Sequence, residues 1–81
     1  MQASIEISMY PLQKDYISSI LEFIHRLNQY PELTVVTNPM STQIYGAYDV
    51  IMQVLTREIK TSFEQKTTNV MVLKMVNMEL K

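Results

Sequence analysis

Segments with the two-residue periodicity of strands alternate along this chain with segments that have the 3.6-residue periodicity of helices, and their order restricts the fold. Apolar and polar residues alternate strictly over residues 4–10, which is typical of a half-buried strand. The whole pattern predicts six elements: a strand over 4–10, a helix from Asp15 to about Tyr30, strands over 33–36 and 42–47, a helix beginning at Asp49, and a strand over 70–80.

This order of elements predicts a ferredoxin-like βαββαβ sandwich of the α+β class. Two βαβ units with right-handed crossovers place four strands in one antiparallel sheet, with both helices on the same face. Asp15 and Asp49 belong to the residue types that cap helix N-termini, and Pro31 disfavours a helical conformation at Tyr30. With 81 residues, the chain is expected to form one small domain over residues 1–81.

The last predicted strand is apolar on both faces. Its two faces carry, respectively, Val70, Val72 and Val76, and Met71, Leu73 and Met75. Two helices on one side can cover only one of these faces, and an exposed apolar strand face is typical of a subunit interface. We therefore expect a homo-oligomer, a dimer or a tetramer, that associates through the sheet.

Several classes of chemistry are excluded by composition. The chain has no cysteine and a single histidine, His25, and no Asp/Glu cluster has metal-ligand spacing. One glycine, Gly46, cannot build a glycine-rich phosphate loop, and no evident base accompanies Ser41 or Thr42 as a nucleophile. We expect no catalytic residue, no metal site and no cofactor, and hence a protein that is not an enzyme.

Nucleic-acid and membrane partners are also not expected. The net charge of −1 offers no attraction for a polyanion, and residues 42–47 contain one aromatic and no cation where an RNA-recognition motif needs both. The longest apolar run, residues 70–73, is far shorter than the roughly 20 residues that span a bilayer. Because no signal-like segment precedes the first strand, we expect a cytoplasmic protein.

Hydrogen-bonding side chains and tyrosines concentrate around residues 38–46. Three of them, Asn38, Ser41 and Thr42, flank a turn led by Pro39. Gly46 either admits the close approach of another group or relieves crowding within a strand. Tyrosine faces beside hydroxyl and amide groups suit a flat heteroaromatic ligand. The candidate ligand-binding residues are Tyr10, Asn38, Ser41, Thr42, Tyr45, Gly46 and Asp49.

The strings Ile7-Ser8-Met9-Tyr10-Pro11-Leu12, Asp15-Tyr16-Ile17 and Thr37-Asn38-Pro39-Met40-Ser41-Thr42, with Gly46 and Asp49, resemble the YkoF-like thiamine-binding family. The resemblance covers nearly the whole chain. It implies a ferredoxin-like domain that binds thiamine or its hydroxymethylpyrimidine moiety, assembles through its sheets, and is linked to thiamine-precursor transport or salvage. The missing phosphate cradle favours free thiamine or the pyrimidine alcohol over the diphosphate.

Two other functions stay open at this point. The chain could be a regulatory module of the ACT kind that binds another small metabolite at a subunit interface. It could also be a purely structural oligomerisation domain, in which case no metabolite would raise its melting temperature.

Overall fold

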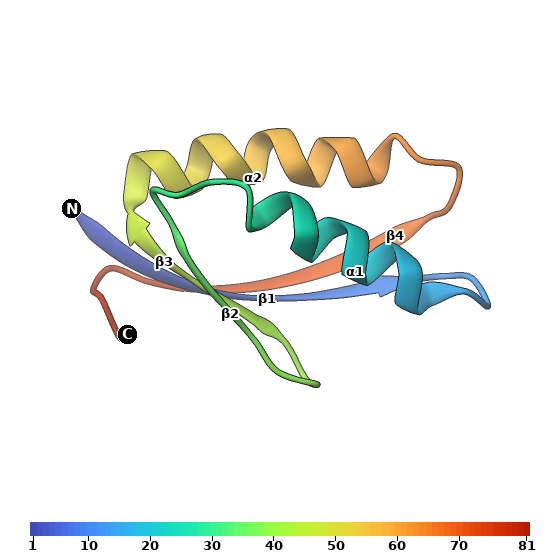
Figure 1. Ribbon diagram of the computed structural model, residues 1–81, viewed down its shortest axis with the longest axis horizontal. Helices are drawn as coiled ribbons and strands as arrows, with labels where there is room; N and C mark the ends of the chain where they lie inside the picture. Colours follow the sequence, from blue (N-terminus) through green and yellow to red (C-terminus); the bar gives the residue numbers. More distant parts are fainter.

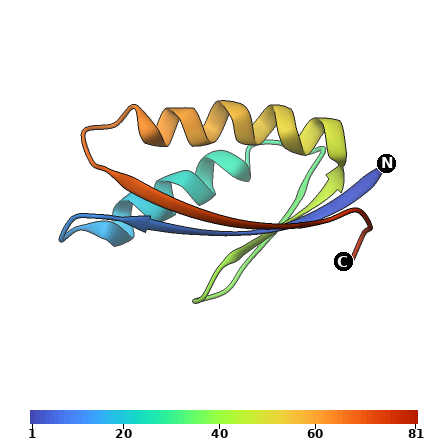
Figure 2. The same cartoon turned by 180° about the vertical axis from the view of Figure 1, so that it is seen from behind.

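The computed structural model describes all 81 residues, and its elements follow the predicted order. These elements are β1 (Gln2–Pro11), α1 (Tyr16–Leu27), β2 (Thr34–Thr37), β3 (Thr42–Ala47), α2 (Tyr48–Phe63) and β4 (Asn69–Val76). The strands form one antiparallel sheet in the order β2-β3-β1-β4, and both helices cover the same face (Figure 1; Figure 2). The predicted ferredoxin-like α+β fold is confirmed.

The core lies between the sheet and the two helices. On β1 the predicted alternation is confirmed, because Ile5, Ile7 and Met9 are at most 8% exposed. They pack in one cluster with Phe23 and Leu27, the buried residues of α1. The buried stripe of α2 adds Ile51, Val54 and Leu55. Burial of each such apolar side chain stabilises the fold by about 1.5–3 kcal/mol, and this free energy favours the packing of both helices against one face of the sheet.

The register between β1 and β4 shows which apolar face of β4 points toward the helices. Met9 lies opposite Met71, and Ile7 lies opposite Leu73. Because residues directly opposite each other share a face, Met71 and Leu73 point toward the helices, and Met71 packs against the core. Val72 therefore points to the open face of the sheet, where no element covers it, and it is 50% exposed.

The two predicted helix caps do not form as expected. Asp15 occupies the N-cap position of α1, but its Oδ2 accepts a hydrogen bond from the Ser18 hydroxyl rather than from a backbone N–H. Asp49 is not a cap, because α2 begins one residue earlier, at Tyr48, directly after β3. Its carboxylate lies instead in the first turn, where the helix dipole favours a negative charge.

The last strand is shorter than predicted and ends at Val76. The following residues turn back over the open face and are fixed by one side chain. The Ser4 hydroxyl donates to the Met78 carbonyl at 2.8 Å and accepts from the Leu80 N–H at 2.9 Å. These bonds replace the strand ladder that the sequence pattern predicted up to Leu80.

A partly buried ion pair joins the two helices. Arg26 Nε lies 2.8 Å from Oε1 of Glu58, whose side chain is 8% exposed. The second carboxylate oxygen of Glu58 accepts the Tyr30 hydroxyl, and Arg26 also donates to Ser62. Arg26 belongs to α1, Glu58 and Ser62 belong to α2, and Tyr30 follows α1, so we assign the network to helix packing.

Candidate functional site

A mismatch in strand length leaves a gap in the sheet beside β1. Ile7 pairs with Thr42, the first residue of β3, whereas β4 continues to pair with β1 as far as Pro11. Residues 8–11 of β1 therefore have a neighbouring strand on the β4 side only. Beyond Thr42 the hairpin formed by β2 and β3 bends away from β1 (Figure 1).

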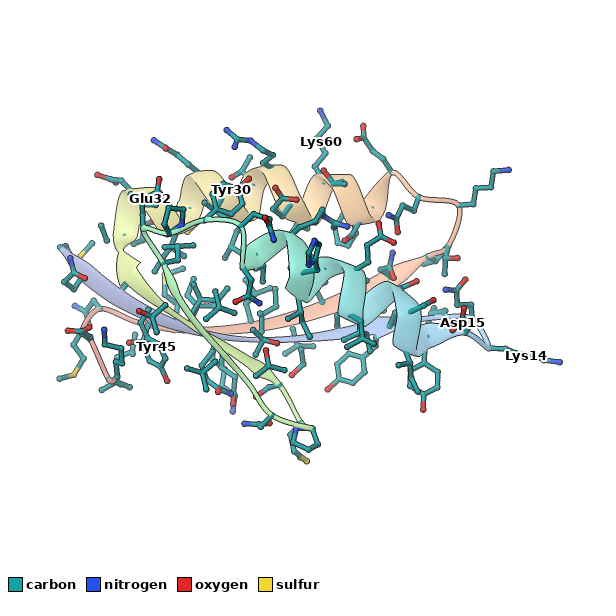
Figure 3. The ribbon with its side chains drawn as sticks, in the orientation of Figure 1. Lys14, Asp15, Tyr30, Glu32, Tyr45 and Lys60 are labelled. Atoms are coloured by element: carbon teal, nitrogen blue, oxygen red, sulfur yellow. The ribbon has the colours of Figure 1, made fainter.

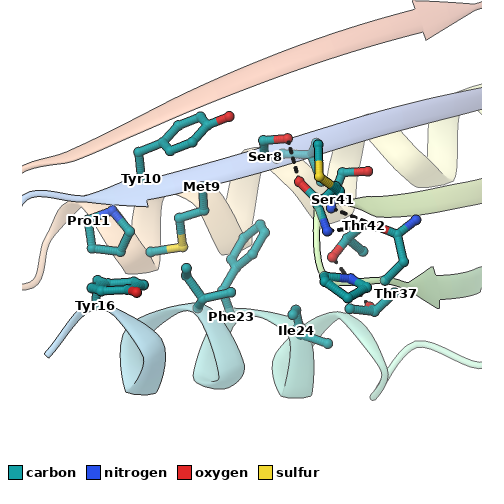
Figure 4. A pocket seen from close by; sticks show the side chains of 15 residues that line it. Ser8, Met9, Tyr10, Pro11, Tyr16, Phe23, Ile24, Thr37, Ser41 and Thr42 are labelled. Carbon is teal, nitrogen blue, oxygen red and sulfur yellow. Dashed lines mark hydrogen bonds between the residues drawn. The ribbon is translucent and has the colours of Figure 1, made fainter.

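A cleft of about 410 Å³ lies at this gap, between α1, the free edge of β1 and the tip of the hairpin (Figure 4). Its volume falls within the range of roughly 300–1,000 Å³ found for small-molecule sites. Met9 and Phe23, both buried, form part of its apolar lining, and Ile24 adds to it from α1. Tyr16 and Pro11 lie together at one end (Figure 4).

Two threonines supply hydroxyl groups at the hairpin end of the cleft. Thr42 is only 5% exposed, and its Oγ1 lies 3.3 Å from Oγ1 of Thr37, so that either group can donate. A hydroxyl can also accept hydrogen bonds, so this pair can adapt to a donor or an acceptor on a ligand.

Asn38 holds the hairpin turn. Its Oδ1 accepts the backbone N–H groups of Met40 at 2.8 Å and Ser41 at 3.0 Å. Such a turn, in which the side-chain oxygen of an asparagine accepts a hydrogen bond from the backbone N–H two residues later, is an Asx-turn. The Asn38 oxygen is therefore already used, which leaves its amide nitrogen for a ligand.

Ser41 is bonded on the opposite side of the sheet from the two threonines. Its hydroxyl donates to Glu6 Oε2 at 2.8 Å and accepts from Gln43 Nε2 at 2.7 Å. The hydrogen bond from Ser41 is the main cause that holds the pKa of the Glu6 carboxyl below its ordinary value, while partial desolvation acts the other way. Lys74, whose Nζ lies 3.5 Å from Glu6 Oε1, favours the same charged form.

The sequence also matches a known protein family. The model of the YKOF-related family matches residues 2–77. The chain belongs to this family. No protein of curated function is significantly similar to it in sequence.

Solved structures of similar proteins show the same fold. Protein SP2199 from Streptococcus pneumoniae is 26% identical, with a TM-score of 0.87, and the match covers 99% of this chain and 90% of that one. The hypothetical protein MJ1052 from Methanocaldococcus jannaschii is also 26% identical, with a TM-score of 0.79 and coverage of 99% and 84%. TM0486 from Thermotoga maritima, named as a candidate thiamine biosynthesis/salvage protein, is 17% identical, with a TM-score of 0.82 and coverage of 100% and 85%.

In this family member, the structure brings four of the seven predicted site residues together. The residues Tyr10, Asn38, Ser41 and Thr42 all line the cleft. Tyr45 does not, because it pairs with Ser4, six residues away from Tyr10 along β1. Figure 3 shows Tyr45 and Asp15 near opposite ends of the molecule. Asp49, two residues after β3, lies at the Tyr45 end, so the turn and the start of α2 do not share one pocket.

Gly46 also lies outside the cleft, and packing explains its identity. A Cβ atom at this position would lie 2.9 Å from Leu33 Cδ2 and 3.4 Å from the Glu32 carbonyl oxygen. Leu33 is 8% exposed, so it has little freedom to move. The space above the glycine is occupied by this leucine, and of the two roles considered from the sequence, relief of crowding is the one the structure supports.

The apolar part of the cleft was missing from the predicted site. Met9 and Ile24 were expected only as residues of the first strand and the first helix, and neither Phe23 nor Tyr16 was included among the binding residues. One signal was present in the sequence, since Tyr16 starts the helix that follows the Tyr10-Pro11 pair. An aromatic at that position is carried by α1 to the edge of β1.

No group of three or more His, Cys, Asp or Glu side chains is placed to hold a metal ion. None of the helices combines the length and the apolar character needed to cross a membrane.

Proposed function

We propose that this chain is a non-enzymatic binding protein for thiamine or its hydroxymethylpyrimidine moiety, and that it serves thiamine uptake or salvage. The observation that carries the proposal is the cleft between α1 and the β2–β3 hairpin, found in a member of the YKOF-related family. The name of the Thermotoga maritima protein, which shares the fold, points to the same metabolism.

The chemistry of the cleft suits an aminopyrimidine. A flat ring fits between the apolar residues of β1 and α1, and the ring of Tyr16 lies at the open end, where it is 49% exposed. The hydroxyls of Thr37 and Thr42 can hydrogen-bond ring nitrogens or an alcohol group. The thiazolium cation of thiamine would gain from facing a tyrosine ring by about 0.5–2 kcal/mol.

The absence of catalytic activity is part of the proposal. Among the candidate binding residues, Ser41 has a hydroxyl that is bonded to a carboxylate, at 2.8 Å from Glu6. The lowered pKa of Glu6 makes its carboxylate a weaker base and therefore a poor partner for a nucleophile. We also propose that binding needs no metal, no cofactor and no phosphate group on the ligand.

We propose further that the chain acts as a cytoplasmic homo-oligomer that associates through the sheet. The open face carries Val70, Val72 and Tyr10, which are 45%, 50% and 53% exposed. A link to a thiamine-precursor transporter remains an expectation from the family resemblance.

Isothermal titration of the full chain with thiamine, hydroxymethylpyrimidine and thiamine diphosphate tests the proposed function. We expect saturable binding of one ligand per chain for thiamine or the pyrimidine alcohol, unchanged by a chelator, and no tighter binding of the diphosphate. Failure of both ligands to bind would refute the proposal. Melting shifts with amino acids instead would indicate an ACT-like module, and no shift with any metabolite would indicate a structural role.

A further inference from the structure

The main-chain polar groups of β1 alternate in direction, and two hydrogen bonds fix the alternation. The Leu12 N–H donates to the Thr68 carbonyl at 2.9 Å, toward β4. The Met1 carbonyl accepts the Tyr48 N–H at 2.9 Å, toward the end of β3. In an antiparallel strand, successive residues direct their N–H and C=O groups to opposite neighbours. The odd-numbered residues of β1 therefore face the β3 side.

Met9 is the odd-numbered residue whose partner on that side is missing. Two residues beyond the Ile7–Thr42 pair, the register would place Met40 opposite Met9. The Met40 N–H donates instead to Asn38 Oδ1, and no backbone hydrogen bond joins Met9 to the hairpin. Pro11, the next odd-numbered residue, has no N–H. Met9 thus presents one free donor and one free acceptor, side by side, at the lining of the cleft.

The free edge is too short to bind another strand. An exposed edge commonly pairs with a further strand or an extended peptide. Here only residues 8–11 lack a neighbour on the β3 side, and Pro11 offers no backbone N–H to a further strand. In addition, α1 and the hairpin tip flank the cleft on both sides of this edge (Figure 4). A ligand that offers one adjacent donor–acceptor pair on a flat ring would satisfy both groups, which are otherwise costly to leave unpaired in a partly buried site.

We infer that the main chain of Met9 is the specificity-determining element of the site and selects an amino-substituted nitrogen heteroaromatic ring. The ring nitrogen accepts the Met9 N–H, and the neighbouring exocyclic amino group donates to the Met9 carbonyl. This inference rests on the proposed function and adds the group that distinguishes an aminopyrimidine from a ring of the same shape. It also adds a main-chain donor and acceptor at fixed positions to the hydroxyl and amide side chains that line the cleft.

An amide-to-ester replacement at Met9 tests the inference. In a chemically synthesised full chain, an ester between Ser8 and Met9 removes the Met9 N–H and leaves every side chain in place. Because this N–H faces away from β4, the β1–β4 ladder keeps all its donors. The ester weakens only the Ser8 carbonyl as an acceptor toward β4, so the melting temperature should fall modestly. We expect affinity for hydroxymethylpyrimidine to fall roughly 2- to 13-fold, as for one lost hydrogen bond. The matched control is an ester between Thr34 and Val35, which removes an outward-facing N–H on the edge strand β2 away from the cleft and should retain the affinity.

A ligand analogue provides a second arm that needs no protein variant. Replacing the amino group of hydroxymethylpyrimidine by methyl keeps its shape but removes the donor, and the unmodified protein should bind this analogue at least several-fold more weakly. Equal affinity for the two ligands, or unchanged affinity of the ester protein, would overturn the inference while the proposed function stands. If neither thiamine nor the alcohol binds the unmodified protein, both the proposed function and this inference fail.

Discussion

The hydroxyl of Ser41 donates a 2.8 Å hydrogen bond to Oε2 of Glu6, and this bond ties the tip of the β2–β3 hairpin to the open face of the sheet. Ser41 is one residue before Thr42, yet the two side chains point to opposite sides of the hairpin. Thr42 lies on the helix side beside the cleft, and Ser41 holds a carboxylate in its charged form. The two hydroxyls are therefore expected to have different roles.

Removing the Ser41 hydroxyl should raise the pKa of Glu6 toward its ordinary value of 4.5, since this hydrogen bond is the main cause of the lowering. A group with a lowered folded-state pKa stabilises the protein above its unfolded-state pKa and loses that contribution as the pH falls through the folded value. The Ser41→Ala variant should thus lose less stability on acidification below about pH 4.5 than the wild type. Carbon-13 NMR titration of the Glu6 carboxyl measures the shift directly. Ser18→Ala on α1 is the control, and an identical Glu6 titration in both variants would contradict this assignment.

Thr42→Val should weaken ligand binding roughly 2- to 13-fold, as expected for one neutral hydrogen bond of about 0.5–1.5 kcal/mol. Valine has the same shape, so the buried position stays filled. Ser41→Ala should cause a smaller loss, because the Ser41 hydroxyl is bonded to Glu6. Titration calorimetry compares the two variants. If both bind thiamine like the wild type, the ligand does not contact the hairpin tip.

Tyr16 and Tyr45 lie near opposite ends of the molecule, and only the replacement of Tyr16 should weaken ligand binding. Tyr16→Leu removes an aromatic face worth about 0.5–1.5 kcal/mol at the mouth of the cleft, so affinity should fall by roughly 2- to 13-fold. Tyr45→Leu, at the other end of the sheet, is the matched control and should bind like the wild type. The reverse result, with Tyr45 sensitive and Tyr16 neutral, would move the site to the start of α2.

Substitutions at two neighbouring residues of β4 should distinguish an effect on oligomer assembly from an effect on folding. Val72 lies on the open face, so Val72→Glu should dissociate a sheet-mediated oligomer while the monomer stays folded. Met71 packs against the core on the other face, so Met71→Glu should lower the melting temperature instead. Sedimentation velocity and circular dichroism give the two readouts. A wild-type protein that is monomeric at micromolar concentration would remove the proposed oligomer.

Glu58→Ala should destabilise the fold by about 3 kcal/mol, the lower end for a broken buried pair, because it leaves the partly buried Arg26 guanidinium without its main partner. Glu22→Ala removes the exposed partner of the same arginine and should cost at most about 1 kcal/mol. Urea unfolding measures both free energies. Equal and small effects would show that the Arg26–Glu58 pair contributes little to helix packing.

The fold was largely predictable because its periodic signals are strong and local. Strict alternation at Ile5, Ile7 and Met9 determined the buried face of β1, and the structure confirms it. The predicted span of β3 is also confirmed. The end of β4 was not predictable, because it depends on the Ser4 hydroxyl, 74 residues before Met78 in the chain.

The candidate site was predictable only in part, for geometric reasons. Thr42 and Tyr45 are three residues apart, but a strand advances about 3.3 Å per residue and alternates faces, so the two side chains lie roughly 10 Å apart along the strand and on opposite faces. The cleft itself arises because β1 extends past the start of β3. Such a mismatch is a property of the register between strands, which no single segment reveals.

Intermolecular nuclear Overhauser effects between bound thiamine and methyl-labelled protein test the central claim most directly. We predict contacts from the pyrimidine ring and its methyl group to the methyls of Met9, Ile20 and Ile24, which line the cleft. No contacts are expected to Ala47 or Val50, beside Tyr45 and the start of α2. Contacts to those two residues, with none to Met9 and Ile24, would contradict the account.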